Sequence, residues 1–239
     1  MTSESIDIIN AFALLTNFVI LPALSYGSQL ALGALAVTLV YSILRFSNFA
    51  QGDSMAFGTM LVILISGYMI SRGWTITGVP TALLAIPMAL IGMSIYLLTM
   101  DRLVYRHYRR IKAKSIVGIS ASIGVMFVTG GIVRFILGAS AQRFGDGERF
   151  IFSVREFKAY TGLEQGIALK TSQFLTVTIA LLLVAFLFYF LQKTKTGKAM
   201  RAYSDNKELA LLSGIDPDKV VQITWLLVAL FTTIAGTLY

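Results

Sequence analysis

The residues best suited to polar chemistry lie in one short stretch, SNFAQGDSMAFG (47–58), within an otherwise apolar region. It holds Asn48, Gln51, Gly52 and Asp53, with the aromatic Phe49 among them. Amides and carboxylates next to hydrocarbon are costly unless they face protein, water or a cavity. Proteins that move solutes place broken helices beside the substrate route. The stretch therefore predicts either a substrate pathway formed by these five residues or a plain interfacial turn with Asn48 as a helix cap.

A second polar passage, 193–219, separates two strongly apolar segments and carries six Lys/Arg against four Asp/Glu. We expect a surface helix from 199 to 213, preceded by Gly197 and ended by a left-handed Gly214. Leu209, Leu212 and their neighbours give it an apolar side that fits a groove on a partner protein. The sequence therefore predicts a docking helix, whose candidate contact residues are Arg201, Asp205, Asn206, Glu208, Ala210, Leu211, Gly214 and Ile215.

Catalytic motifs are absent from the sequence. It has no cysteine and one histidine, which excludes disulfides and argues against a metal site. The nearest approach to a phosphate-binding loop, Gly197-Lys198, has Gln192 in place of the first glycine and Ala199 after the lysine. We therefore predict a chain that is not an enzyme and binds no cofactor or metal. A partner must supply any energy that it uses.

Composition indicates a membrane protein. The 239 residues are 56% hydrophobic and only 13% charged, with a mean hydropathy of +0.76, well outside the balance of a soluble domain. The net charge of +8 could suggest nucleic acid as a partner, but the basic residues concentrate in short loops between apolar segments. That distribution is typical of lipid-embedded proteins, so we expect a lipid bilayer around the chain and no nucleic acid.

The apolar segments predict an all-α, polytopic membrane bundle that forms a single domain over 1–239, with about seven spans. The second segment is short, so we expect a discontinuous or re-entrant region near 29–53. The fifth is rich in small residues and is expected to pack in the bundle interior. The last is still apolar at Tyr239, which predicts a truncated final helix. The expected spans are 8–26, 29–45, 55–70, 80–99, 115–137, 171–192 and 220 onward.

The charges of the loops predict the topology. Loop 101–115 has six Lys/Arg and one acid, and two spans separate it from 193–219, so both belong on one face. The positive-inside rule makes that face cytoplasmic. Loop 138–170 is nearly neutral, with five Lys/Arg against four acids, and is expected outside, in the periplasm. Counting back through the expected spans puts the N-terminus in the cytoplasm.

Residues 27–60 resemble the N-terminal signature of the permease subunits of branched-chain amino-acid ABC importers. In that signature a helix of small residues is followed by Asn-Phe-Ala-His-Gly-Glu/Asp. Asn48, Phe49, Gly52 and Asp53 match it, as does Ala50, while Gln51 stands where histidine is usual. This exchange keeps the hydrogen-bonding capacity and removes a titratable group.

Residues 196–216 are similar to the cytoplasmic loop of the same family. Glu208, Ala210 and Gly214 also fit the broader Glu-Ala-Ala-x-x-x-Gly pattern of importer permeases, with Leu209 replacing the middle alanine. The resemblance implies that this element couples movements of a separate ATPase to alternating access. It also implies a second permease subunit, identical or homologous, a periplasmic substrate-binding protein and a bacterial cytoplasmic (inner) membrane.

Several alternatives remain open at this point. Importers of urea and short amides share both motifs, so the substrate could belong to either class. A channel or proton-coupled secondary carrier is a hypothesis from another class; such proteins generally place ionisable relays in mid-span. For 193–219, the alternative to protein docking is a basic loop held on anionic lipid.

Overall fold

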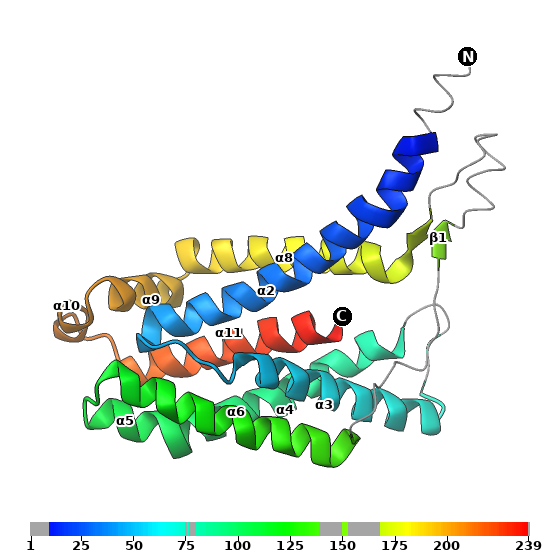
Figure 1. Ribbon diagram of the computed structural model, residues 1–239. Coiled ribbons are helices and arrows are strands. Elements are labelled where there is room, and N and C mark those ends of the chain that lie inside the picture. Colours follow the sequence, from blue (N-terminus) through cyan, green and yellow to red (C-terminus); the bar gives the residue numbers. More distant parts are fainter. Residues whose placement is uncertain (1–9, 75, 77–79, 139–149, 153–167, 239) are drawn as a thin grey trace.

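The computed structural model describes residues 10–74, 76, 80–138, 150–152 and 168–238, and these are almost entirely helical (Figure 1). The predicted helical membrane bundle is confirmed, with the addition of a short antiparallel pair of strands, β1 (Phe150–Phe152) and β2 (Leu169–Lys170). The helices are η1 (Thr16–Ile20), α2 (Leu21–Leu44), α3 (Gln51–Ser71), α4 (Thr81–Met100), η2 (Asp101–Tyr105), α5 (Arg106–Arg110), α6 (Ser115–Leu137), α8 (Thr171–Lys193), α9 (Lys195–Asp205), α10 (Lys207–Leu212) and α11 (Pro217–Thr237).

The first two expected spans are one helix. Asn10–Leu44 is helical throughout, including the π-helical segment η1, so the predicted division at Gly27 and Ser28 is wrong. An isolated glycine costs only about 1 kcal/mol in a helix interior. Opening the backbone beside hydrocarbon costs several kcal/mol for each unpaired group, so the helix continues. The described ranges therefore contain six candidate spans instead of about seven.

The fourth span also extends further than expected. Helix α4 continues through η2 and α5, so Thr81–Arg110 is helical and the first two thirds of the predicted loop 101–115 belong to this helix. The added part of the helix lies beyond the apolar stretch, so its cationic side chains can reach water. As a result, Asp101, Tyr105 and Arg109 follow one another at intervals of four residues on one helix face.

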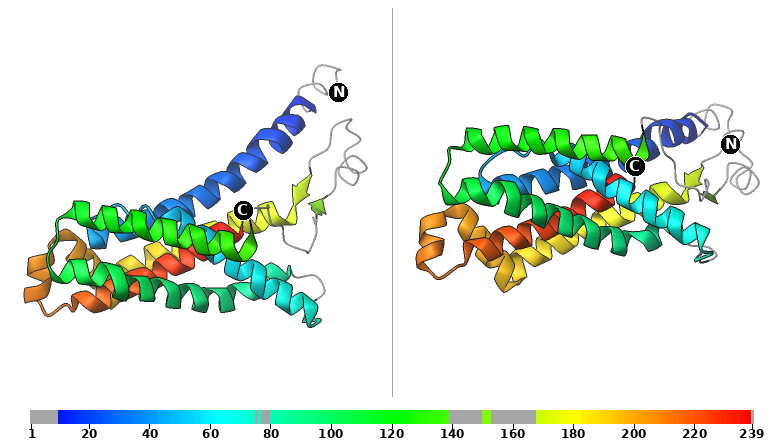
Figure 2. Two further views of the ribbon diagram at one scale, coloured as in Figure 1. Left: turned by 60° about the horizontal axis from the view of Figure 1, so that its bottom comes forward. Right: turned by 90° about the horizontal axis from the view of Figure 1, so that it is seen from below.

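Helix α11 is the central helix of the bundle, in contrast to the prediction for 115–137. In the apolar stretch of α11 72% of the residues are buried, against 28% in α6 and 17% in α8. It packs against α2, α3 and α4, and both Figure 1 and Figure 2 show it between the other long helices. Its buried hydroxyls at Thr224, Thr232 and Thr237 donate to carbonyls of their own helix. The small residues of α6 therefore did not predict the most buried helix, which is α11 with its hydroxyl-bearing side chains.

Two glycines allow α3 and α11 to cross closely. A Cβ on Gly236 would lie 2.8 Å from the carbonyl oxygen of Met55 and would also collide with the Thr59 hydroxyl. A Cβ on Gly58 would lie 3.1 Å from the Cα of Thr233. The backbones of these two helices are therefore in near contact.

The two predicted basic segments lie at the same end of the bundle. Helices α5, α9 and α10 gather there in Figure 2, and Arg106 of α5 pairs with Asp218 of α11 at 2.7 Å. We call this the basic end. The first described helix, which begins at Asn10, starts at the opposite end, near β1. The predicted cytoplasmic N-terminus depended on the count of seven spans, and most of loop 138–170 lies outside the described residues.

The crossing of α3 and α11 makes a testable prediction. Gly236→Ala should lower the midpoint of thermal unfolding in detergent, because overpacking a tight contact costs about 1–3 kcal/mol. Gly67→Ala is the matched control: it lies on α3, and no described atom lies within 4 Å of its missing Cβ. Equal midpoints for the two variants would contradict the close crossing.

Candidate functional site

The predicted docking segment is a pair of helices, α9 and α10, and not one helix over 199–213. Asn206 separates them, with φ −145° and ψ 105°, and its side-chain oxygen accepts hydrogen bonds from the backbone N–H groups of Glu208 (3.0 Å) and Leu209 (3.1 Å). Asparagine competes in this way with helix continuation. Gly214 has φ +80°, as the prediction of a left-handed stop required. Asp216 then caps α11 by accepting from the N–H of Asp218.

Helix α9 is fixed to the rest of the bundle. Its side chains Met200 and Tyr203 are buried in the main hydrophobic core. Only Thr194 separates α9 from α8, and a Cβ on Gly197 would lie 2.6 Å from the Cα of Leu191. The guanidinium group of Arg45 donates to the Ser204 carbonyl, and the Ser204 hydroxyl donates to the Ser42 carbonyl at 3.2 Å. Helix α9 is therefore tied to both α8 and the end of α2.

Helix α10 lies at the basic end (Figure 1) and carries exposed leucines. Leu209 is 60% exposed, Leu211 43% and Leu212 85%, while Ala210 is buried. Ile215 packs against the core, so the predicted contact residues Ala210 and Ile215 point inward. The predicted polar contacts Arg201, Asp205, Asn206 and Glu208 are exposed, as is Gly214. An exposed cluster of leucines with a polar rim is typical of a protein interaction site.

The other candidate site, 47–53, forms the turn between α2 and α3 and its first helical residues, also at the basic end. Arg45 ends α2 with φ 60°. The side-chain oxygen of Asn48 accepts from the Ala50 N–H and from the Tyr105 hydroxyl, both at 3.2 Å, and Ser122 accepts from the Phe49 N–H at 3.1 Å. The break in the chain therefore falls at 45–50, while 29–44 belongs to the long first helix.

The remaining predicted pathway residues differ in their surroundings. Phe49 is exposed, as is Gly52. Gln51 is buried, and neither side-chain amide atom has a hydrogen-bond partner among the described residues. Asp53 is half-buried against α6, where a Cβ on Gly130 would lie 2.8 Å from its carboxylate. The start of α3 thus holds two different polar groups. The buried amide of Gln51 has no hydrogen-bond partner among the described residues, and the Asp53 carboxylate packs where α6 has room only for a glycine.

A charged cluster that the sequence analysis missed joins these two sites. The carboxylate of Asp101 is buried and accepts from the indole N–H of Trp225 (2.8 Å) and from the guanidinium group of Arg109. The Tyr105 ring stacks on Trp225 with a centroid separation of 5.5 Å. The sequence did contain a signal: Asp101, Tyr105 and Arg109 are four residues apart. It was overlooked because the segment was interpreted as a loop that sets topology.

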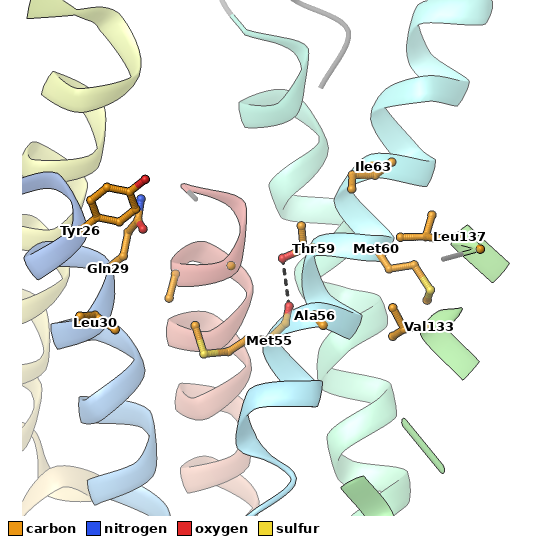
Figure 3. Close-up of a pocket in the computed structure, with 13 residues that line it drawn as sticks. Tyr26, Gln29, Leu30, Met55, Ala56, Thr59, Met60, Ile63, Val133 and Leu137 are labelled. Atoms are coloured by element: carbon orange, nitrogen blue, oxygen red, sulfur yellow. Dashed lines mark hydrogen bonds between the residues drawn. The ribbon is translucent and has the colours of Figure 1, made fainter. Parts of the chain in front are cut away.

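A cavity of about 500 Å³ lies nearer the opposite end, between α2, α3, α6 and the end of α11 (Figure 3). Leu30, Met55, Met60 and Val133 are among its mainly apolar lining. Gln29 of α2 and Thr59 of α3 add polar groups; Gln29 donates to the Leu238 carbonyl. None of the five predicted pathway residues lines this cavity. Several lining residues, such as Gln29 and Met55, fall within 27–60, but only the packing of the helices shows that they surround one cavity.

In the described part of the chain, no group of three or more His, Cys, Asp or Glu residues could hold a metal ion. Asp101 and Asp218 at the basic end pair with arginines, and Asp216 pairs with Lys219 and accepts from a backbone N–H group. The arrangement is suited to docking and to transmission of movement.

Comparison with known proteins gives a consistent result. Residues 19–239 match the family described as "Branched-chain amino acid transport system / permease component". The chain is 26% identical over 219 residues to the high-affinity branched-chain amino acid transport system permease protein LivH of Salmonella typhimurium, covering 89% of this chain and 66% of that protein.

The LivH protein of Escherichia coli K12 is 25% identical over the same shares of the two chains. The probable branched-chain amino acid transport permease protein LivH of Methanocaldococcus jannaschii is 26% identical over 218 residues, 90% of this chain and 64% of that protein. The chain thus spans just under two thirds of the length of these relatives. No solved structure matches it.

The hydrogen bonds of Asn48 make a testable prediction. Asn48→Leu should lower the midpoint of thermal unfolding in detergent, because it leaves the buried Tyr105 hydroxyl without its acceptor, at a cost of about 1–3 kcal/mol. Phe49→Leu, at the exposed neighbouring position, should leave the midpoint unchanged. A midpoint for Asn48→Leu equal to that of the control would show that the turn does not depend on this side chain.

Proposed function

The chain belongs to the permease-component family of branched-chain amino acid transport systems, and on that premise we propose that it is the membrane-spanning subunit of an ATP-driven importer. It catalyses no reaction itself. A separate ATPase hydrolyses the nucleotide, a periplasmic binding protein delivers the substrate, and a second permease, identical or homologous, completes the route. The membrane is the cytoplasmic (inner) membrane of a bacterium.

The observation that carries this proposal is the exposure of Leu209, Leu211 and Leu212 on α10, at the end of the bundle and outside the six candidate spans. Anchoring on lipid needs basic residues and apolar side chains together, yet Glu208 and Asp205 flank these leucines. Acidic residues disfavour anionic headgroups and are compatible with a protein groove. We therefore assign α10 to the ATPase interface.

The positive-inside rule supports a cytoplasmic location for the basic end, which contains loop 101–115 and the docking segment. With six spans, the described N-terminal helix then begins on the external side. This orientation replaces the one expected from seven spans. The β1–β2 pair would face the binding protein.

In the transport cycle that we propose, closure of the ATPase dimer moves α10 and α9 together. The contacts of Ser204 with Arg45 and Ser42 keep α9 against the end of α2, and the movement then reaches the turn that holds Asn48, Phe49, Gln51, Gly52 and Asp53. These five residues would form the cytoplasmic gate of the pathway. Alternating access then follows from two arrangements of packed helices.

The cavity supports branched-chain amino acids as substrates over urea or short amides. Its apolar lining, which includes two methionines, suits an aliphatic side chain. Urea offers little apolar surface and needs several hydrogen-bond partners. A proton-coupled carrier is disfavoured because, in the spans that the structure describes, Asp101 and Asp218 pair with arginines, and only Asp53, which packs against Gly130 of α6, remains as a carboxylate for a mid-span relay.

Charge placed on α10 tests the docking assignment. Leu212→Glu should reduce co-purification of the ATPase and ATP-dependent uptake of leucine into proteoliposomes by at least about tenfold, because desolvating the new carboxylate in an apolar groove costs more than about 1.4 kcal/mol. Ile111→Glu is the control, an exposed apolar residue in the other segment at the basic end. Normal uptake by Leu212→Glu would refute the docking role.

Filling the cavity tests the route. Ala56→Trp should reduce uptake of leucine several-fold or more while the ATPase remains bound, because the indole occupies space that the substrate side chain needs. Val184→Trp on the exposed face of α8 adds similar bulk away from the cavity and should leave uptake unchanged. The measurement is initial uptake rate at equal amounts of purified complex; equal rates for the two variants would remove the cavity from the route.

A further inference from the structure

We propose that Asp101 is the positioning residue that transmits movement of the docking segment to the turn between α2 and α3. This inference rests on the proposed function, because it assigns a mechanical role within the transport cycle. Its basis is a continuous series of contacts from the start of α11, through Asp101, to Asn48.

Asp101 is only 4% exposed, although it belongs to a segment rich in exposed cations. A carboxylate buried to this degree requires opposite charge and hydrogen-bond donors. It obtains them from two directions: Arg109 two helical turns further along the same helix, and Trp225 on α11. Asp101 therefore joins the helix Thr81–Arg110 to the central helix of the bundle.

The series of contacts begins next to the docking segment. Asp218 is the second residue of α11, separated from α10 by the turn that contains Gly214. Its carboxylate accepts from Arg106 at 2.7 Å, and its other oxygen lies 3.9 Å from Arg109. Any displacement of α10 that pulls on the start of α11 therefore acts on Arg106 and on Arg109, the partner of Asp101.

The series ends at the α2–α3 turn. The Tyr105 ring lies one helical turn beyond Asp101 and contacts both Trp225, at 5.5 Å, and Phe46, at 5.4 Å between ring centroids. The Tyr105 hydroxyl donates to Asn48. On the far side, Gly118 of α6 leaves only enough space for the Phe46 ring, because a Cβ there would lie 3.0 Å from it. The turn cannot shift without moving the Tyr105 ring.

Arg109 gives the series two alternative arrangements. It pairs now with Asp101, while Asp218 lies 3.9 Å away, about 1 Å beyond a direct hydrogen bond. A cavity of about 10 Å³, the room of a single water, adjoins the Asp101, Arg106, Arg109 and Asp218 side chains. A small shift at the start of α11 would move Arg109 toward Asp218 and loosen Asp101. Coupling between sites requires an element of this kind, with two states that both sites bias.

The test uses the assembled complex with its ATPase and compares Asp101→Asn with Trp225→Phe and Arg102→Gln. Asp101→Asn keeps an oxygen for Trp225 and removes the charge that holds Arg109. Trp225→Phe keeps a ring against Tyr105 and removes only the indole donor. Arg102 is exposed and adjoins the same small cavity, so Arg102→Gln is the matched control.

A positioning role predicts that uptake falls at least tenfold in Asp101→Asn and several-fold in Trp225→Phe. ATP hydrolysis and co-purification of the ATPase should stay within twofold of the unmodified complex, and Arg102→Gln should match it throughout. A proportional fall of uptake, hydrolysis and assembly in both variants at Asp101 and Trp225 would overturn the inference, because it would indicate a purely structural role. Unchanged uptake in Asp101→Asn would also overturn it.

A second readout follows the movement itself. The sequence contains no cysteine, so spin labels can be attached at introduced cysteines without background. Ser213 beside α10 and Ser47 in the turn are exposed, and the exposed Phe127 on α6 provides a reference. In the unmodified complex ATP should shift both the Ser213–Phe127 and the Ser47–Phe127 distance distributions. In Asp101→Asn only the first should shift; a normal shift at Ser47 would overturn the inference.

The two proposals fail in distinguishable ways. If the unmodified complex takes up no branched-chain amino acid with ATP, the proposed function is wrong. The distance measurement still decides on Asp101, because it requires only the ATPase and ATP.

Discussion

The burial of most of α11 is the constraint on which the rest of the structure depends. A helix surrounded by other helices in a bilayer must satisfy its polar groups internally, and Thr224, Thr232 and Thr237 do so through carbonyls of their own helix. Trp225 of α11 donates its indole N–H to the Asp101 carboxylate on the neighbouring helix. Because α11 begins directly after the docking segment, the central helix connects the surface that meets a partner with the interior of the bundle.

The docking segment divides into a fixed part and a presented part. Buried side chains and the contacts with α2 and α8 hold α9, while α10 packs mainly against α9 and leaves its leucines exposed. The separation depends on Asn206, whose side chain caps α10 and ends α9. This arrangement allows a partner to bind α10 without disturbing the core, while any force on α10 still reaches the bundle through α9 and the start of α11.

Sequence reasoning predicted the features that local chemistry determines. The span 171–192 matches α8 to within one residue, and Gly214 adopts the expected left-handed conformation. It failed where tertiary context decides. Gly27 and Ser28 do not interrupt the first helix, because backbone N–H and C=O groups that left the helix inside a bilayer would find no water to bond. The small residues of 115–137 did not identify the interior helix, and the pairing of Asp101 with Trp225, 124 residues apart, leaves no local trace.

The junction between α8 and α9 has a consequence for the membrane around the protein. A single residue, Thr194, connects the two helices, and Gly197 brings α9 against the backbone of α8, so they form one rigid elbow. Helix α8 is the least buried of the candidate spans. A change in bilayer thickness that tilts α8 is therefore expected to change the angle of α9. If α9 and α10 meet an ATPase as proposed, the lipid composition of the host membrane would influence that contact.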